Sequence, residues 1–168
     1  MDSANGILIY RSADAPTLEA SGCEIHVPMT DLQIAGVTKI ADAGYGDGYK
    51  VNVLVNIPGF SLVWLWFKQN FPLPLHSHDV DCLYFIIAGS LKLGTETLGV
   101  KDSFFIPADV PYNYKAGNEG VEVLEIRHAN QFEFRNLAKN MAFYDKAVET
   151  VLANRSAWQN APPLTNVV

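Results

Sequence analysis

The run Pro74-Leu-His-Ser-His-Asp-Val-Asp-Cys-Leu-Tyr-Phe-Ile-Ile-Ala-Gly89 carries the strongest structural signal in the chain. His76 and His78 are two of its four histidines. Side chains alternate between the faces of an extended strand, so both imidazoles are predicted to lie on one face. Two adjacent imidazoles form half of a metal site. After a polar bend, the β-prone residues 82–88 predict a strand that ends in a turn at Gly89.

Composition and charge restrict the class of protein. The 168 residues are 49% hydrophobic and 18% charged, as expected for one globular domain with a core. The net charge of −6 and the lack of a basic face argue against nucleic-acid binding. No apolar run reaches the roughly eighteen residues of a membrane span, and the N-terminus lacks the pattern of a signal peptide. We therefore expect a cytoplasmic protein in which Cys23 and Cys82 are free thiols.

The segments before the histidines predict mainly β-structure. Trp64 and Trp66 share one face of a strand that is apolar on both faces, which suits core residues or, for Trp66, contact with a ligand. The predicted segments are an N-terminal β arm over residues 1–31 with short strands at 7–10 and 23–27, a β-prone run at 37–40, a glycine-rich loop at 42–49, and strands at 50–57 and 60–68 joined by the turn Pro58-Gly59.

The segments after the histidines continue this pattern up to a C-terminal helix. Short strands broken by Gly and Pro, with no alternation of strands and helices, predict an all-β antiparallel sandwich or barrel. An apolar stripe with helical spacing predicts a helix over residues 136–152 that packs on the barrel or forms a dimer contact. The expected strands are 91–94, 95–98, 103–106, 111–115 and 121–128, with a loop at 116–120, and the stripe consists of Leu137, Met141, Tyr144, Val148 and Val151.

Residues 50–128 resemble the cupin superfamily. His76, His78 and Gly89 match the first cupin motif, in which Cys82 replaces the usual Glu, and Gly99, Asp102 and Pro107 match the second, in which Tyr112 replaces the usual His. The resemblance implies a single domain with a double-sheet jelly-roll barrel over residues 32–128 and a site in the barrel mouth. It also implies a divalent metal, with Fe or Zn expected first, and a homodimer.

Several residues are candidates for the third metal ligand. Cys82 is either a soft ligand or a buried thiol, and Tyr112 is either a phenolate ligand or a hydrogen-bond donor to the substrate. In the last strand, His128 shares one face with Leu124 and Ile126, while Glu125 lies on the other face. The pattern leaves open which face points inward, so His128 and Glu125 are candidates beside Cys82 and Tyr112.

These residues predict a cupin that processes a small organic molecule carrying a carbonyl or carboxylate. Tyr84 and Tyr112 are predicted acid/base groups, and Tyr114 and Trp66 are predicted substrate contacts. A dioxygenase-type oxidation is expected first, with isomerase or lyase chemistry next. Thiol dioxygenases are cupins that also carry Cys at the Glu position, but this chain lacks their third His at the second motif, so their activity is not transferred. The alternative is a non-catalytic, metal-free binding module.

Overall fold

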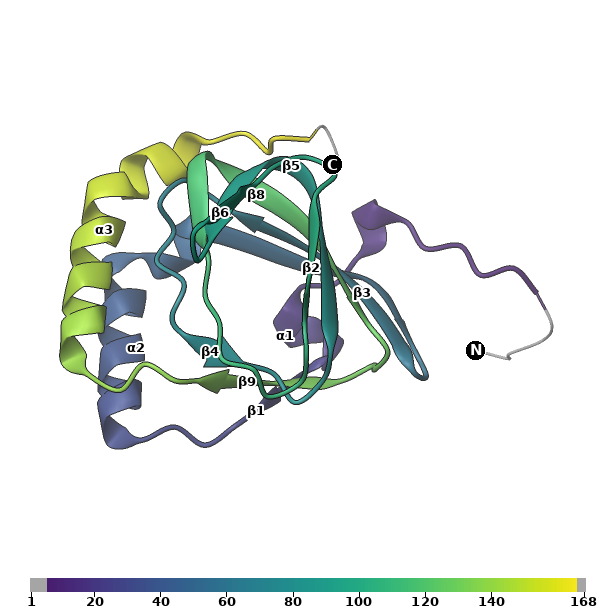
Figure 1. The fold of residues 1–168 in the computed structure, drawn as a ribbon, viewed down its shortest axis with the longest axis horizontal. Coiled ribbons are helices and arrows are strands. Elements are labelled where there is room, and N and C mark those ends of the chain that lie inside the picture. Colours follow the sequence, from purple (N-terminus) through teal and green to yellow (C-terminus); the bar gives the residue numbers. More distant parts are fainter. Residues whose placement is uncertain (1–5, 166–168) are drawn as a thin grey trace.

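The computed structural model describes residues 6–165 as two β-sheets with two long helices beside them (Figure 1). The large sheet has six strands in which β2-β3-β8-β5-β6 are neighbours and β7 pairs with β5, and the small sheet has the order β1-β9-β4. The strands are β1 (Glu24–His26), β2 (Tyr49–Ile57), β3 (Phe60–Phe67), β4 (His76–Ser77), β5 (Cys82–Leu93), β6 (Glu96–Leu98), β7 (Ser103–Ile106), β8 (Lys115–Arg127) and β9 (Phe132–Asn136). The helices are α1 (Leu18–Ser21), α2 (Asp31–Ala43) and α3 (Met141–Asn160), with short 3-10 turns η1 (Ser12–Asp14) and η2 (Tyr45–Gly48).

The predicted β-class is confirmed, and several strands lie where they were expected. β2 and β3 pair in antiparallel fashion across the turn at Pro58-Gly59, and β7 covers the predicted residues 103–106. The predicted turn at Gly89 is wrong, because β5 continues to Leu93. Gly89 has a φ of 70°, and the register of β5 against β8 shifts just after it, so this glycine forms a bulge within one long strand. Likewise, residues 116–120 belong to β8 instead of a loop.

Helix α2 replaces the β-prone run that was predicted at residues 37–40. Its start is fixed by a capping box in which the Gln33 backbone N–H donates to Thr30 Oγ1 at 3.3 Å and the Thr30 N–H donates to Gln33 Oε1 at 2.9 Å. Gly44, with a φ of 102°, ends the helix in the left-handed conformation. The two caps and the packing against α3 outweigh the β-propensity of Val37, Thr38 and Ile40.

The N-terminal arm is only partly a β arm. β1 confirms the strand expected near residues 23–27 and pairs in parallel with β9. Residues 7–10 form no strand, because no other strand lies beside them, and Ile7 is 94% exposed. Residues 1–5, which the predicted arm included, lie outside the described residues.

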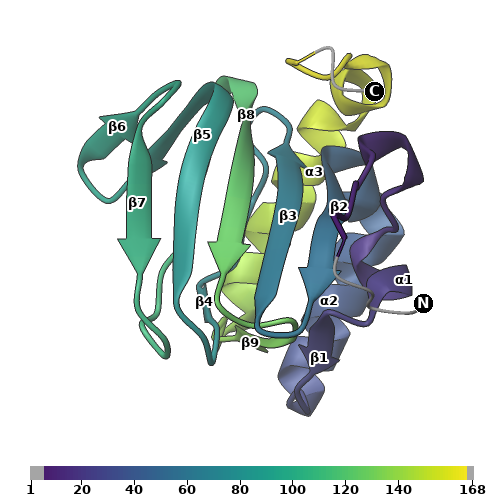
Figure 2. The ribbon, with the colours of Figure 1, turned by 90° about the vertical axis from the view of Figure 1, so that its right-hand side faces the viewer.

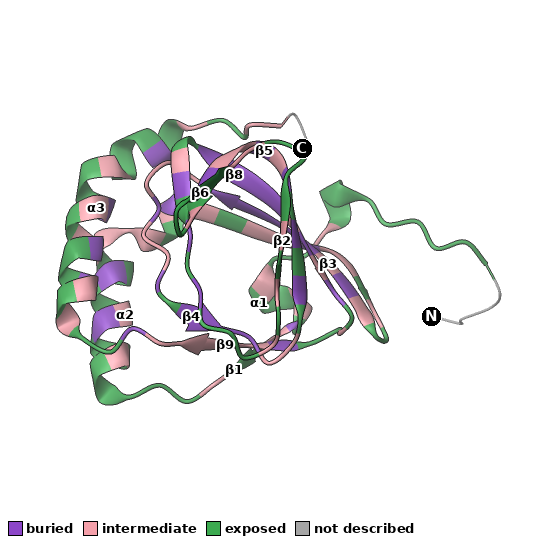
Figure 3. Cartoon of the chain, viewed as in Figure 1, coloured by how far each residue is buried: buried purple, intermediate pink, exposed green. Residues whose placement is uncertain are grey.

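The C-terminal helix begins later and extends further than predicted. Asn136, where the helix was expected to begin, is the last residue of β9, and the Asn140 side chain caps α3 by accepting from the Phe143 N–H at 3.1 Å. The buried side chains of α3 include Tyr144, Val151 and Trp158. They face α2 and the main core of the same chain, so this stripe belongs to the fold of one subunit (Figure 3).

Figure 2 shows the large sheet from its outer face, with α2 and α3 behind it. On this face Leu83, Phe85 and Phe105 are 38%, 36% and 55% exposed, whereas the inward-pointing Tyr84 and Ile86 are fully buried. The homodimer stays a prediction. None of the helices within residues 6–165 combines the length and the apolar character needed to cross a membrane.

The contact between α2 and α3 gives the first testable prediction. A Cβ atom on Gly36 would lie 2.3 Å from Cδ2 of Tyr144, whose side chain is fully buried. Because the ring has no free space to move into, Gly36→Ala is expected to lower the free energy of unfolding by about 2–3 kcal/mol in urea titrations. Gly46→Ala is the control, since no atom lies within 4 Å of its added Cβ. Equal effects of the two substitutions would contradict close packing at Gly36.

Candidate functional site

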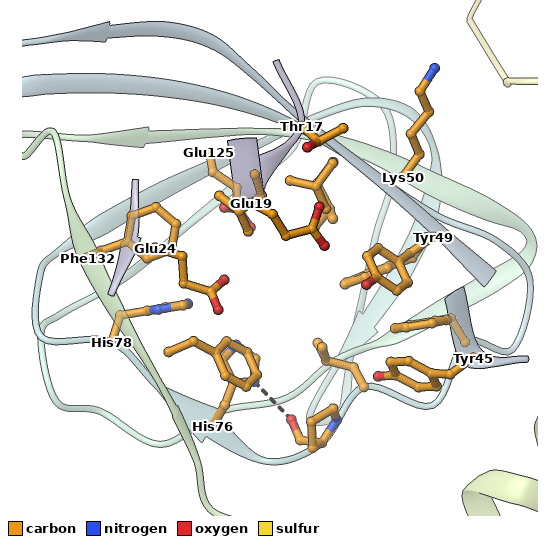
Figure 4. Close-up of a pocket in the computed structure, with 18 of the residues that line it drawn as sticks. Thr17, Glu19, Glu24, Tyr45, Tyr49, Lys50, His76, His78, Glu125 and Phe132 are labelled. Atoms are coloured by element: carbon orange, nitrogen blue, oxygen red, sulfur yellow. Dashed lines mark hydrogen bonds between the residues drawn. The ribbon is translucent and has the colours of Figure 1, made fainter. Parts of the chain in front are cut away.

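A cavity of about 490 Å³ lies between the large and the small sheet. Strands β2, β3 and β8 contribute Val51, Leu65 and Glu125 to its wall. On the side of the small sheet, His76 of β4 and His78, just after this strand, line the cavity. The glycine-rich turn η2 and the short helix α1 form part of the rim (Figure 4). The volume suits a small organic molecule.

His76 of β4 and His78, which follows the end of this strand, lie side by side in the cavity, as their spacing predicts. His76 and His78 are 3% and 7% exposed, and their ring centroids are 5.2 Å apart. The backbone holds Tyr112 opposite His76 through two hydrogen bonds, in which each residue's N–H donates to the carbonyl of the other. Phe134 of β9 stacks on the His76 ring at 4.8 Å. Both imidazoles are therefore held in fixed orientations.

Hydrogen bonding defines the tautomer of each imidazole. Nδ1 of His76 lies 2.9 Å from the Pro74 carbonyl oxygen, and Nδ1 of His78 lies 2.7 Å from the Glu133 carbonyl oxygen. A carbonyl only accepts, so each Nδ1 carries the proton. Neither Nε2 has a hydrogen-bond partner among residues 6–165. The two Nε2 lone pairs are thus available to a ligand or a metal.

Burial keeps both histidines neutral. Desolvation is the main cause that lowers the pKa of His76 to about 4, and the hydrogen bond to Pro74 opposes it. Desolvation also lowers the pKa of His78 to about 4, with Arg127 acting in the same direction. At neutral pH the pair therefore presents acceptors and not cations.

The predicted tyrosines lie at the same end of the cavity. The hydroxyls of Tyr84 and Tyr112 are hydrogen-bonded to each other, and Tyr112 and Tyr114 line the cavity, whereas Tyr84 lies behind its wall. Desolvation raises the pKa of all three phenols, so they stay protonated. Tyr112 thus presents a neutral phenol beside His76, with ring centroids 4.3 Å apart.

Three other predicted site residues do not line the cavity. Cys82 is 1% exposed, its thiol points to the Leu83 carbonyl at 3.8 Å, and desolvation raises its pKa to about 12. Trp66 projects from the opposite face of β3 to the cavity-lining Leu65, with Lys68 Nζ 4.7 Å above its ring. His128 follows the end of β8 and is exposed. These placements correct the expectation that all three face the ligand.

Strand β8 turns the face that carries Glu125 and Arg127 inward. Arg127 Nη2 lies 2.8 Å from Glu125 Oε2, with side-chain exposures of 0% and 12%. The guanidinium also packs 3.9 Å from the centroid of the Phe132 ring. Its Nε and Nη1 have no hydrogen-bond partner among the described residues. The cavity therefore contains a buried ion pair whose carboxylate is nearer to the solvent.

Several lining residues were missed in the sequence. Glu24 and His26 of β1 both line the cavity, and so do Phe132 and Phe134, their register partners on the neighbouring strand β9. The two members of each pair are two residues apart in the sequence, and this spacing places both side chains on one face of a strand. Tyr45 lies in the glycine-rich segment that was read only as a loop.

Among residues 6–165, no group of three or more His, Cys, Asp and Glu side chains is arranged to hold a metal ion. Two neutral imidazoles with free Nε2 atoms still match the ligand preference of divalent Zn and Fe. The donor set thus fits a metal as a two-histidine site, in which the other positions are left to water or to oxygen atoms of a ligand.

Comparisons with known proteins identify the fold. No protein-family model matches the sequence, and a search of curated proteins finds no match. The structure is similar to that of the polyketide cyclase RemF from Streptomyces resistomycificus, with a TM-score of 0.53 and 19% identity over 63% of this chain and 82% of that chain. A protein of unknown function with a cupin-like fold from Ralstonia eutropha JMP134 aligns over 90% of both chains, with a TM-score of 0.52 and 14% identity.

Proposed function

Because the chain has the cupin fold, we propose that its cavity binds and transforms a small organic molecule with a divalent metal held by His76 and His78. The observation that carries this proposal is the pair of neutral imidazoles, each with Nδ1 bonded to a backbone carbonyl and Nε2 free in the cavity. Histidines that bind a metal commonly donate their other ring N–H to a backbone carbonyl in this way, which fixes the tautomer and the orientation of the ring.

A bound metal would supply a Lewis acid for a substrate oxygen and open positions for further ligands. The protein's own groups would orient the substrate and handle protons. Tyr112, kept neutral and bonded to Tyr84, holds a proton that it can donate to a substrate oxygen near His76. Tyr114 offers a second neutral phenol on the same wall.

The reaction that we propose first is a dioxygenase-type oxidation, with isomerase or lyase chemistry as alternatives. Iron held by the two histidines would supply the redox chemistry toward dioxygen that such an oxidation needs. Aromatic side chains, among them Tyr45, Phe67 and Phe71, form part of the cavity wall against which a reacting molecule would pack. A non-catalytic binding module is the competing function, and it differs in that no metal is required.

Metal content tests the proposal. The purified chain, reconstituted anaerobically with Fe(II) or Zn(II), is expected to hold one ion per chain by elemental analysis. Removing either imidazole halves the protein ligand set, so His76→Ala and His78→Ala are each expected to weaken metal binding by about 100-fold or more. At a metal concentration of about 100 times Kd, the ion should stabilise the unsubstituted protein by about 2.7 kcal/mol.

His128→Gln is the matched control, because it replaces an exposed histidine outside the cavity. It should retain both the stoichiometry and the stabilisation. A reconstituted protein with no metal, or with metal that persists in both alanine variants, would contradict the proposed site and favour the binding module.

A further inference from the structure

The two ends of the cavity differ in chemistry. At one end, Tyr45, Tyr49, Phe67 and Phe71 form a cluster in which Phe71 lies 4.6 Å from Tyr45 and 4.5 Å from Phe67 between ring centroids. At the other end lie both histidines and two carboxyl side chains. Figure 4 shows Tyr45 and Tyr49 on one side of the cavity and His76, His78 and Glu24 on the other. A bound molecule therefore meets rings at one end and polar atoms at the other.

The polar end offers mainly hydrogen-bond acceptors. Both Nε2 atoms are unprotonated, because each Nδ1 donates to a carbonyl. The Glu24 side chain forms no hydrogen bond or ion pair with other residues of the described chain, and it points into the cavity (Figure 4). Glu125 adds a carboxylate whose contact with Arg127 uses one oxygen. Such a surface is complementary to a molecule that carries O–H or N–H donors.

The two cationic side chains on the described cavity wall are Lys50 and Arg127. Nε and Nη1 of Arg127 have no hydrogen-bond partner among the described residues, but Glu125 balances the charge of its guanidinium through a contact of 2.8 Å between Oε2 and Nη2. Lys50 points away from the cavity in Figure 4, and its Nζ lies 5.8 Å from the ring of Trp64 on the outer face of the sheet. A carboxylate in the cavity would lie near the two carboxylates of Glu24 and Glu125, which outnumber the single positive charge of Arg127, so its burial there is costly.

We propose that the ligand is a neutral aromatic molecule with hydroxyl groups, its rings against the aromatic cluster and its hydroxyls at the histidine end. This inference rests on the proposed function in that it assigns the substrate class of the same cavity. Without metal, the hydroxyls donate to the Nε2 atoms and to the carboxylates. With a metal held by the histidines, Glu24 and Glu125 would remain as acceptors for the hydroxyl protons.

Calorimetric titration of the full chain, treated with EDTA, tests the ligand class with three probes of the same ring size. 2,3-Dihydroxynaphthalene provides donors, 2,3-dimethoxynaphthalene provides none, and 2-naphthoate provides a carboxylate. At pH 7.5 the dihydroxy compound is expected to bind at least about tenfold more tightly than either of the others, since its hydroxyls satisfy buried acceptors. Equal binding of the dimethoxy compound, tighter binding of 2-naphthoate, or no binding of any probe would each overturn the proposal.

Glu24→Leu tests the contribution of Glu24, a hydrogen-bond acceptor that the sequence analysis did not predict. It is expected to weaken binding of 2,3-dihydroxynaphthalene by about fivefold or more and to leave binding of the dimethoxy compound unchanged, which also shows that the cavity is intact. Glu119→Gln, at an exposed position of β8 outside the cavity, should change neither affinity. Metal content is measured separately, so a failed metal site and a wrong ligand class give different results.

Discussion

Lowering the pH from 7.5 to 4.5 is expected to remove about 3–5 kcal/mol from the free energy of unfolding of the metal-free protein through His76 and His78. In the folded state, desolvation lowers the pKa of both imidazoles to about 4, against an ordinary value of 6.5. Between these two values the unfolded chain binds more protons than the folded chain. Stability therefore falls as the pH drops through 6.5 and stops falling, as far as these groups are concerned, below about 4.

Urea denaturation in the presence of EDTA measures this difference. The double variant His76→Gln/His78→Gln lacks both groups, so its stability should change much less between the two pH values, even if it is less stable at both. His128→Gln replaces an exposed histidine and should retain the full loss. If the double variant loses as much stability as the unsubstituted protein, other groups cause the acid sensitivity.

The histidine pair was predictable because its geometry depends only on local alternation. One residue separates His76 from His78, and an extended backbone then places both rings together in any register. The cap of α2 was also a local signal, since Thr30 and Gln33 have capping-box spacing. It was missed because the β-branched residues at 37, 38 and 40 suggested a strand.

Other parts of the site depend on tertiary packing. Alternation divided β8 into two faces, and hydrophobicity alone favoured neither of them. The more polar face turns inward because Glu125 and Arg127 compensate each other's charge, whereas His128 lies beyond the strand and is exposed. The distinction between Tyr112 in the wall and Cys82 behind it likewise depends on how β4, β5 and β8 pack, and the motif positions do not contain that information.

The buried pair of Glu125 and Arg127 is expected to give the other large effect. Glu125→Gln leaves the guanidinium fully buried without a counter-charge, and arginine cannot become neutral by losing a proton. We expect a loss of about 3–5 kcal/mol in the free energy of unfolding. Arg127→Met should cost less, about 1–3 kcal/mol, because Glu125 retains some exposed surface and can take up a proton or water.

A double substitution distinguishes the stability that the ion pair itself contributes from the cost of leaving one buried charge without its partner. Glu125→Leu/Arg127→Met removes both charges and keeps apolar volume next to Phe132, so it should be more stable than Glu125→Gln by about 2 kcal/mol or more. The ion pair of Lys39 and Asp145 is the control, with side chains 50% and 51% exposed. Its alanine variants should lose no more than about 1 kcal/mol, because water already solvates both charges. If Glu125→Gln lost no more unfolding free energy than these variants, the guanidinium of Arg127 would have access to water or to another partner in the folded protein. The cavity would then contain a cation available to anionic ligands.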